Sequence, residues 1–323
     1  MSYRLSIWYG NRSKQNCSNC NWLKQANRRT LNMAMDSSEN TYLNDPENGA
    51  EMARLLDQDR TLTKAMNGLL SEQSSVENFH DVLDIACGPG GWVQEVAFVY
   101  PQMQVTGIDI SKAMIDYAIM QARLQHLENA HFKVMDATKP LNFPDASFDL
   151  VNARTIAGFM LTSSWPPLLR ECQRILRPGG IIRLTETDLW GTTNSNAFGQ
   201  LSNMVMMSLF LSKHSFDASG NTFGITPMLK RLLGLAGFQS IETRPHAIDF
   251  SAGAAAYSAM YQNFSVFYKI IQPFLFKTQR AFPQAHIPDQ DKVEQLYNQM
   301  LTEMLSDDFV GIIYMLTAWG QKP

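Results

Sequence analysis

Apolar residues follow two different periods along this chain. Between residues 41 and 70, Leu62, Met66 and Leu69 recur at intervals of four and three positions, which is the spacing of one face of a helix. From Asp81 onward, short runs rich in β-branched residues alternate with longer helical segments. This alternation is typical of parallel strands joined by crossover helices. The sequence therefore predicts an α/β fold.

The strands and helices of this fold can be placed from the same pattern. Strands are expected at residues 82–86, 105–110, 131–136, 148–153, 181–186, 239–250 and 311–321. Helices are expected near residues 91–99, 112–126, 165–176 and 226–236, and Ser111 is well placed to cap the second of them. We expect a Rossmann-like, seven-stranded, mostly parallel sheet with helices on both faces, an N-terminal helical arm and helical cap insertions.

The chain divides into three regions by composition and pattern. Residues 1–40 form a polar arm, whose first 35 positions carry six basic residues and no acidic one. Residues 41–80 form a helical segment, and residues 81–323 form the α/β domain, with cap insertions at about 190–225 and 251–300. We interpret the arm as peripheral because it lacks apolar periodicity. A targeting segment, a nucleic-acid arm and a later translation start are the alternatives.

Composition narrows the class of protein. The chain has 323 residues, of which 45% are hydrophobic, and a formal net charge of −3, as expected of a globular protein. No apolar run reaches the roughly 20 residues of a membrane-spanning helix, and no secretory signal is visible. We therefore expect a cytoplasmic protein without a membrane span. Cys17 and Cys20 lack the second ligand pair that a zinc site needs, so no metal is expected.

A glycine-containing turn follows the first predicted strand. The sequence VLDIACGPG, Val82 to Gly90, leads an apolar strand into a turn that opens a helix, so that backbone amides face a ligand. Asp109 follows Gly90 by 19 residues and ends the next strand, where an acid accepts hydrogen bonds from ribose hydroxyls. Pro89 in the turn and Asp84 in the strand favour a ligand without a pyrophosphate, although an NAD-dependent oxidoreductase stays an alternative.

These motifs resemble those of the class I S-adenosylmethionine (SAM)-dependent methyltransferases. VLDIACGPGG is similar to their first motif and GIDIS to their second, while MDATKPLNFPDASFDLV resembles their third and fourth. RILRPGGIIRLTE resembles the helix, turn and strand that follow, so the match runs in order over about residues 80–188. The chain is also similar to the ubiquinone/menaquinone-type and natural-product small-molecule methyltransferases. This resemblance implies SAM as the cofactor and S-adenosylhomocysteine (SAH) as its product.

The resemblance also implies which residues contact the cofactor. They share a position at or just beyond the carboxyl ends of the predicted strands. Asp84, Ala86, Gly88 and Gly90 would meet the methionine moiety, Asp109 the ribose, Ile110, Asp136 and Ala137 the adenine, and Asn152 and Arg154 the methionine and sulfonium side.

Four of these residues have structural alternatives. Asp109 could help to start a helix, and Asp136 could stabilise a turn. Asp84 could be a buried acid bonded to local amides. Arg154 could simply pair with an acid.

The sequence does not single out a catalytic base. Methyl transfer needs a base only where the acceptor loses a proton. The candidates on segments expected near the site are Glu186, His214, His246 and Tyr257, with Tyr261 and Tyr314 as further tyrosines. Each of them could equally have a structural role.

The acceptor is expected to be a small, largely apolar molecule, such as a quinone, a terpenoid-like compound or another natural product of secondary metabolism. The apolar helix at 204–211, a candidate lid, and the aromatic block at 257–276 supply side chains suited to an apolar pocket. Core packing and a homo-oligomer interface are alternatives for both. The chain that follows the basic arm has a net negative charge, which argues against nucleic acid as a partner. A protein methyltransferase and a SAM-binding scaffold or cyclase stay open.

Overall fold

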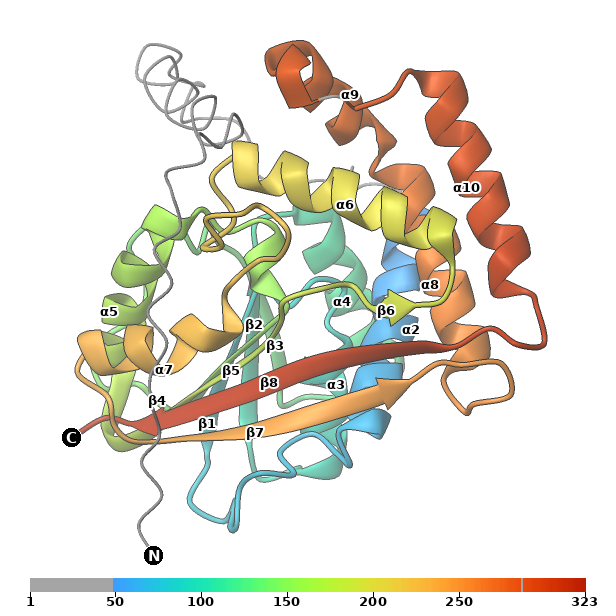
Figure 1. Ribbon diagram of the computed structural model, residues 1–323. Helices are drawn as coiled ribbons and strands as arrows, with labels where there is room; N and C mark the ends of the chain where they lie inside the picture. Colours follow the sequence, from blue (N-terminus) through green and yellow to red (C-terminus); the bar gives the residue numbers. More distant parts are fainter. Residues whose placement is uncertain (1–48, 286) are drawn as a thin grey trace, which may run out of the picture. The chain divides into compact units, whose positions relative to one another are not determined.

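A computed structural model describes residues 49–285 and 287–323 (Figure 1). They belong to one compact unit that spans residues 42–323. The arm expected at residues 1–40, including its cysteine pair, lies outside the described residues. From the segment expected at 41–80, the structure describes a helix, α2 (Gly49–Ala65), within the same compact unit as the sheet.

The described residues contain one sheet of eight strands. These are β1 (Asp81–Ile85), β2 (Gln104–Asp109), β3 (Ala130–Val134), β4 (Phe148–Arg154), β5 (Leu176–Thr187), β6 (Thr192–Thr193), β7 (Gln239–Asp249) and β8 (Gly311–Gln321). The order is β3-β2-β1-β4-β5-β8-β6, and β7 pairs with β8. The first five strands are parallel, whereas β8 is antiparallel to β5, β6 and β7.

The mostly parallel α/β sheet expected from the sequence is confirmed. All seven expected strands are present, and the two-residue β6 is the additional one. A strand of two residues is too short to show a period of two, which is why the sequence pattern did not reveal it.

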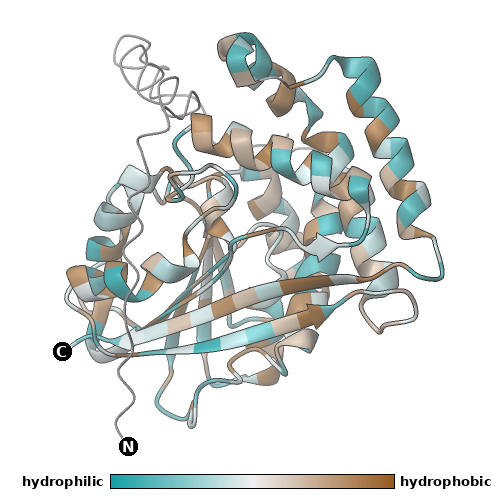
Figure 2. Ribbon diagram, in the orientation of Figure 1, coloured by the Kyte–Doolittle hydropathy of each residue, from teal (hydrophilic) through white to brown (hydrophobic). Residues whose placement is uncertain are grey.

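Helices connect and cover these strands. They are α3 (Gly91–Val99), α4 (Lys112–Leu124), α5 (Trp165–Ile175), α6 (Asn196–Leu211), α7 (Thr226–Leu235), α8 (Tyr257–Ile270), α9 (Gln272–Ala281) and α10 (Gln290–Met304). Ser111 caps α4 as expected, because its side chain accepts a hydrogen bond from the amide of Met114. α10 packs against α6 and α8, and α9 packs against α6 (Figure 1). Figure 2 shows α10 with alternating hydrophilic and hydrophobic bands, as expected of an amphipathic helix.

Alternate residues of each strand face opposite sides of the sheet. Val82 and Leu150 pack with Trp92 of α3 in one apolar cluster. Leu83 and Val151 lie on the other face, in a larger cluster to which α5, α6, α7, α8, α9 and α10 contribute. The larger cluster therefore joins the sheet to the helices of both expected cap insertions.

The apolar helix expected at 204–211 is the second half of α6. Met206 is 1% exposed and lies in the larger cluster with Leu201 and Leu209. Of the alternatives for this helix, the packing favours the core over a mobile lid.

Candidate functional site

The glycine-containing turn has the backbone that its sequence indicates. Ala86, Gly88 and Gly90 have φ angles of 56°, 53° and 81°, in the left-handed region. A Cβ atom on Gly90 would lie 2.6 Å from the ring of Phe132 and 2.9 Å from the Cβ of Ala118. Only glycine therefore fits at position 90, and the turn passes directly into α3.

Asp109 lies at the end of β2 and contacts this turn. Its Oδ2 accepts a hydrogen bond from the Gly88 amide at 3.0 Å, and its Oδ1 accepts one from the Ser111 amide at 2.8 Å. Burial raises the pKa of Asp109, and the two amides act in the opposite direction. The next residue, Ile110, is 43% exposed. The structure thus brings together the turn, an acid and an accessible apolar side chain.

Asp136 and Ala137 follow β3 at the same edge of the sheet. The Met135 amide donates to the Asp109 carbonyl at 2.9 Å, which holds the ends of β2 and β3 together. Asp136 Oδ1 accepts from the Thr138 amide at 2.8 Å and from its hydroxyl at 2.7 Å. Asp136 therefore does stabilise a turn, and its contact with adenine stays a prediction.

Asp84 and Asn152 are neighbours on β1 and β4. Asn152 Nδ2 donates to Asp84 Oδ1 at 2.7 Å, and both residues are buried. Burial raises the pKa of Asp84 to about 7, while Asn152 and Arg183 of β5 favour its ionised form. Arg183 was not among the predicted site residues, although an arginine inside the apolar strand IIRLTE indicates a buried charge that needs partners.

Arg154, at the end of β4, is held by α2. It forms an ion pair with Asp59, and its Nη1 donates to Thr63 Oγ1 at 3.0 Å. A Cβ on Gly91 would lie 2.8 Å from Asp59 Oδ2, so α2 also reaches the start of α3. Arg154 therefore pairs with an acid, which was the structural alternative to its predicted role beside the cofactor. No sequence motif could have placed α2 at the glycine-containing turn.

The four candidates for a catalytic base lie in separate surroundings. Glu186 accepts from the Ile156 amide at 2.8 Å, and burial raises its pKa to about 8. His214 is buried just after α6, which lowers its pKa to about 4. His246 shares a hydrogen bond with a threonine of β8, and the Tyr257 hydroxyl donates to a carbonyl at the end of α10. No hydrogen bond joins any two of these four described side chains, and a catalytic role for each stays a prediction.

An aromatic cluster lies beyond the ends of β4 and β5. The ring centroid of Trp190 is 5.2 Å from that of Phe223 and 4.9 Å from that of Phe267 on α8. A Cβ on Gly158, just after β4, would lie 3.6 Å from the Trp190 ring. Arg54 of α2 is 5.8 Å from the centre of the Phe267 ring. The cluster therefore joins the edge that carries Asn152 and Arg154 to α2 and α8.

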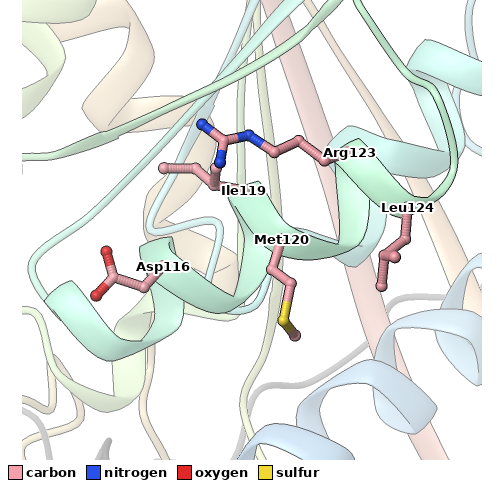
Figure 3. Close-up of a pocket in the computed structure, with 5 residues that line it drawn as sticks. All are labelled: Asp116, Ile119, Met120, Arg123 and Leu124. Atoms are coloured by element: carbon pink, nitrogen blue, oxygen red, sulfur yellow. The ribbon is translucent and has the colours of Figure 1, made fainter.

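A hollow on the outer face of α4 is separate from this arrangement (Figure 3). The residues that line it all come from α4: Asp116, Ile119, Met120, Arg123 and Leu124. None of the predicted cofactor residues is among them. Within residues 49–285 and 287–323, every helix is too short or too polar to span a membrane, and no three His, Cys, Asp or Glu side chains gather as metal ligands would.

Comparison with known proteins gives consistent matches for the central part of the chain. Residues 82–180 match a family described as a methyltransferase domain. A demethylmenaquinone methyltransferase from Listeria welshimeri is 33% identical over 118 residues, which cover 35% of this chain and 47% of that protein. The secondary metabolism regulator laeA of Coprinopsis cinerea is 22% identical over 248 residues, 72% of this chain and 60% of that protein.

A solved structure matches over a longer stretch. The YcgJ protein from Bacillus subtilis superposes with a TM-score of 0.50 at 16% identity, over 80% of this chain and 99% of its own. At this identity the likeness concerns the fold alone. The chain spans about half the length of the first menaquinone-type relatives that it matches.

Proposed function

We propose that this chain transfers a methyl group from SAM to a small, largely apolar acceptor, because residues 82–180 match a methyltransferase domain and carry motifs similar to those of the class I SAM-dependent enzymes. The observation that carries the proposal is the hydrogen bond between Asp109 Oδ2 and the Gly88 amide. It holds the acid of β2 against the turn that follows β1, so one bound nucleoside can contact both.

The residues at this edge suit the parts of SAM. Asp109 would accept the ribose hydroxyls, and the accessible side chain of Ile110 would lie against the adenine. Asp136, joined to β2 through its neighbour Met135, would accept from the adenine amino group. Asp84, in the strand before the turn, would meet the ammonium of the methionine moiety. The donor set contains carboxylates and backbone amides, and it suits a cationic cofactor without phosphates.

SAM supplies the activated methyl group, since its sulfonium makes that carbon electrophilic. The protein has to hold the acceptor in line with the carbon–sulfur bond and to exclude water. A base is required only where the nucleophile loses a proton. Among the four candidates, Glu186 is the carboxyl group, and burial raises its pKa to about 8.

The aromatic cluster supports an apolar acceptor. Trp190, which is partly buried, packs against the buried rings of Phe223 and Phe267 beyond the strand ends, on the side of Asn152 and Arg154. Flat hydrophobic molecules such as quinols and terpenoids pack well against such rings. The menaquinone-type relatives, which are named for a quinone acceptor, point in the same direction.

Calorimetry with SAH tests the cofactor assignment. We expect one site per chain, and Asp109→Ala should weaken binding about 10- to 100-fold, because hydrogen bonds to a charged group contribute about 1.5–3 kcal/mol. The exposed Asp307→Ala is the matched control and should bind like the wild type. Unchanged affinity in a folded Asp109→Ala variant, or binding of a nicotinamide cofactor in place of SAH, would contradict the assignment.

Mass spectrometry tests the acceptor. The protein is incubated with SAM and a panel of phenols, quinols, terpenoids, polyketides and peptides. We expect SAH and a methylated product from an apolar small molecule. Methylation of a peptide would replace the small-molecule assignment, and tight SAM binding without transfer to any compound would favour a scaffold or cyclase.

A further inference from the structure

Four buried polar side chains form a continuous row across one face of the sheet. The strand register places Asp84 beside Asn152 and Asn152 beside Arg183, so their side chains lie on the same face. Asn152 Nδ2 donates to Asp84 Oδ1 at 2.7 Å, and Arg183 Nη1 donates to Asn152 Oδ1 at 2.7 Å. Arg183 also forms an ion pair with Glu72, which lies in the segment after α2.

This row determines the direction in which the Asn152 amide points. A guanidinium only donates hydrogen bonds, so the amide oxygen of Asn152 must face Arg183. Its NH₂ group must then face Asp84, where it holds Oδ1. Oδ2 of Asp84 receives no hydrogen bond from the described residues and is left for another donor. Arg183 therefore sets the orientation of Asp84 without touching it.

The row carries one more negative than positive charge when its acids are ionised. Within the row, Arg183 is the one cation beside the two acids Asp84 and Glu72. Arg154 pairs with Asp59 of α2, and the other basic groups nearby, Arg244 and His246 of β7, lie on the Glu72 side of the row. Arg183 is fully buried and Asp84 is 5% exposed, so an ionised Asp84 without a cation at its free oxygen is costly. A cation bound at Oδ2 of Asp84 would complete the balance.

We propose that Arg183, acting through Asn152, is a positioning residue that presents the free carboxylate oxygen of Asp84 to the ammonium group of SAM. Glu72 holds Arg183 in place. This inference rests on the proposed function and assigns to it two residues, Glu72 and Arg183, which lie before and just after the stretch 82–180.

Two ligands separate this positioning role from a general effect on the fold. SAH carries the amino-acid end, whereas 5′-methylthioadenosine keeps the adenosine and the sulfur but lacks that end. The double variant Arg183→Met/Glu72→Leu removes both members of the buried pair together, which proteins often tolerate without loss of stability. Asn152→Leu breaks the row at its centre with a side chain of similar size and serves as the second variant.

Arg177→Met is the matched control. Arg177 also belongs to β5, but it pairs with Asp81 and Asp149 at the opposite ends of the strands. Calorimetry on all four proteins, with the wild type included, gives the affinity for each ligand. We expect SAH affinity to fall roughly tenfold or more in the double variant and in Asn152→Leu, while 5′-methylthioadenosine affinity stays within about twofold. Arg177→Met should change neither.

The outcomes are distinguishable. Equal losses for the two ligands, or no loss for SAH in either folded variant, would overturn the positioning role. Wild-type protein that binds both ligands equally well would show that the amino-acid end contributes nothing at Asp84, which also overturns it. Wild-type protein that binds neither ligand would instead refute the proposed function itself.

Discussion

Glu186 allows the burial of a carboxyl group to be tested by the pH dependence of stability. Its side chain accepts from the amides of Ile156 and Ala157, at 2.8 and 3.4 Å, and it is 1% exposed. Burial raises its pKa from 4.5 to about 8. The change to make is Glu186→Gln, which removes the charge and keeps an oxygen for the Ile156 amide.

The magnitude follows from the two pKa values. The folded protein binds this proton more tightly than the unfolded chain, so the free energy of unfolding falls as pH rises from 4.5 to about 8. At about 1.36 kcal/mol per pH unit, the ionised group destabilises the fold by roughly 5 kcal/mol at pH values above 8 and by less than about 1 kcal/mol at pH 5. Glutamine carries no such pH-dependent cost.

Urea unfolding of wild type and Glu186→Gln at pH values from 5 to 8.5 measures this difference. Other titrating groups are common to both proteins and cancel. We expect the variant to gain about 3–4 kcal/mol relative to wild type between pH 5 and pH 8. The exposed Glu128→Gln, a control for the loss of charge, should follow the wild-type curve. Parallel curves for Glu186→Gln and wild type would refute the reasoning.

Two further predictions concern stability and use urea unfolding. Met206→Lys places an unpaired charge in the larger apolar cluster and should lower the free energy of unfolding by about 3–5 kcal/mol. The control Asn203→Lys, at an exposed position of α6, should lower it by less than about 0.5 kcal/mol. A folded, stable Met206→Lys protein would instead support the lid. Gly90→Ala should lower the free energy of unfolding by more than about 1 kcal/mol, because position 90 has a positive φ and a Cβ there would contact Phe132. Gly199→Ala in α6, where a Cβ meets nothing within 4 Å, should be neutral or stabilising by up to about 1 kcal/mol. Equal effects of the two changes would show that the turn relaxes.

The sheet was accessible from the sequence because its strands are short, apolar and regularly spaced. β8 was placed at its observed bounds, Gly311–Gln321, and β1 within one residue at each end. α10 was not predicted as a separate helix, although Val293, Leu296, Met300 and Met304 follow a helical period and are all buried.

The contacts of the candidate site could likewise be predicted only in part. The meeting of Asp109 with the glycine-containing turn follows from a general property of parallel sheets, whose carboxyl ends share one edge. The contacts of α2 and Glu72 have no such rule behind them. Asp59 meets Arg154, and Glu72 meets Arg183 across 111 positions of sequence, so only the packed chain reveals them.

These long-range pairs bear on how the chain can change over evolutionary time. Arg154 lies on β4 within the stretch that matches the methyltransferase domain, and Arg183 lies on β5 just beyond it, whereas their acidic partners precede that stretch. A relative's segment grafted over residues 82–190 would bring strands without the partners that fit them. Substitutions at positions 59 and 154, and at 72 and 183, are therefore expected to occur together among the descendants of this sequence, and the helical region before the sheet should diverge in step with it.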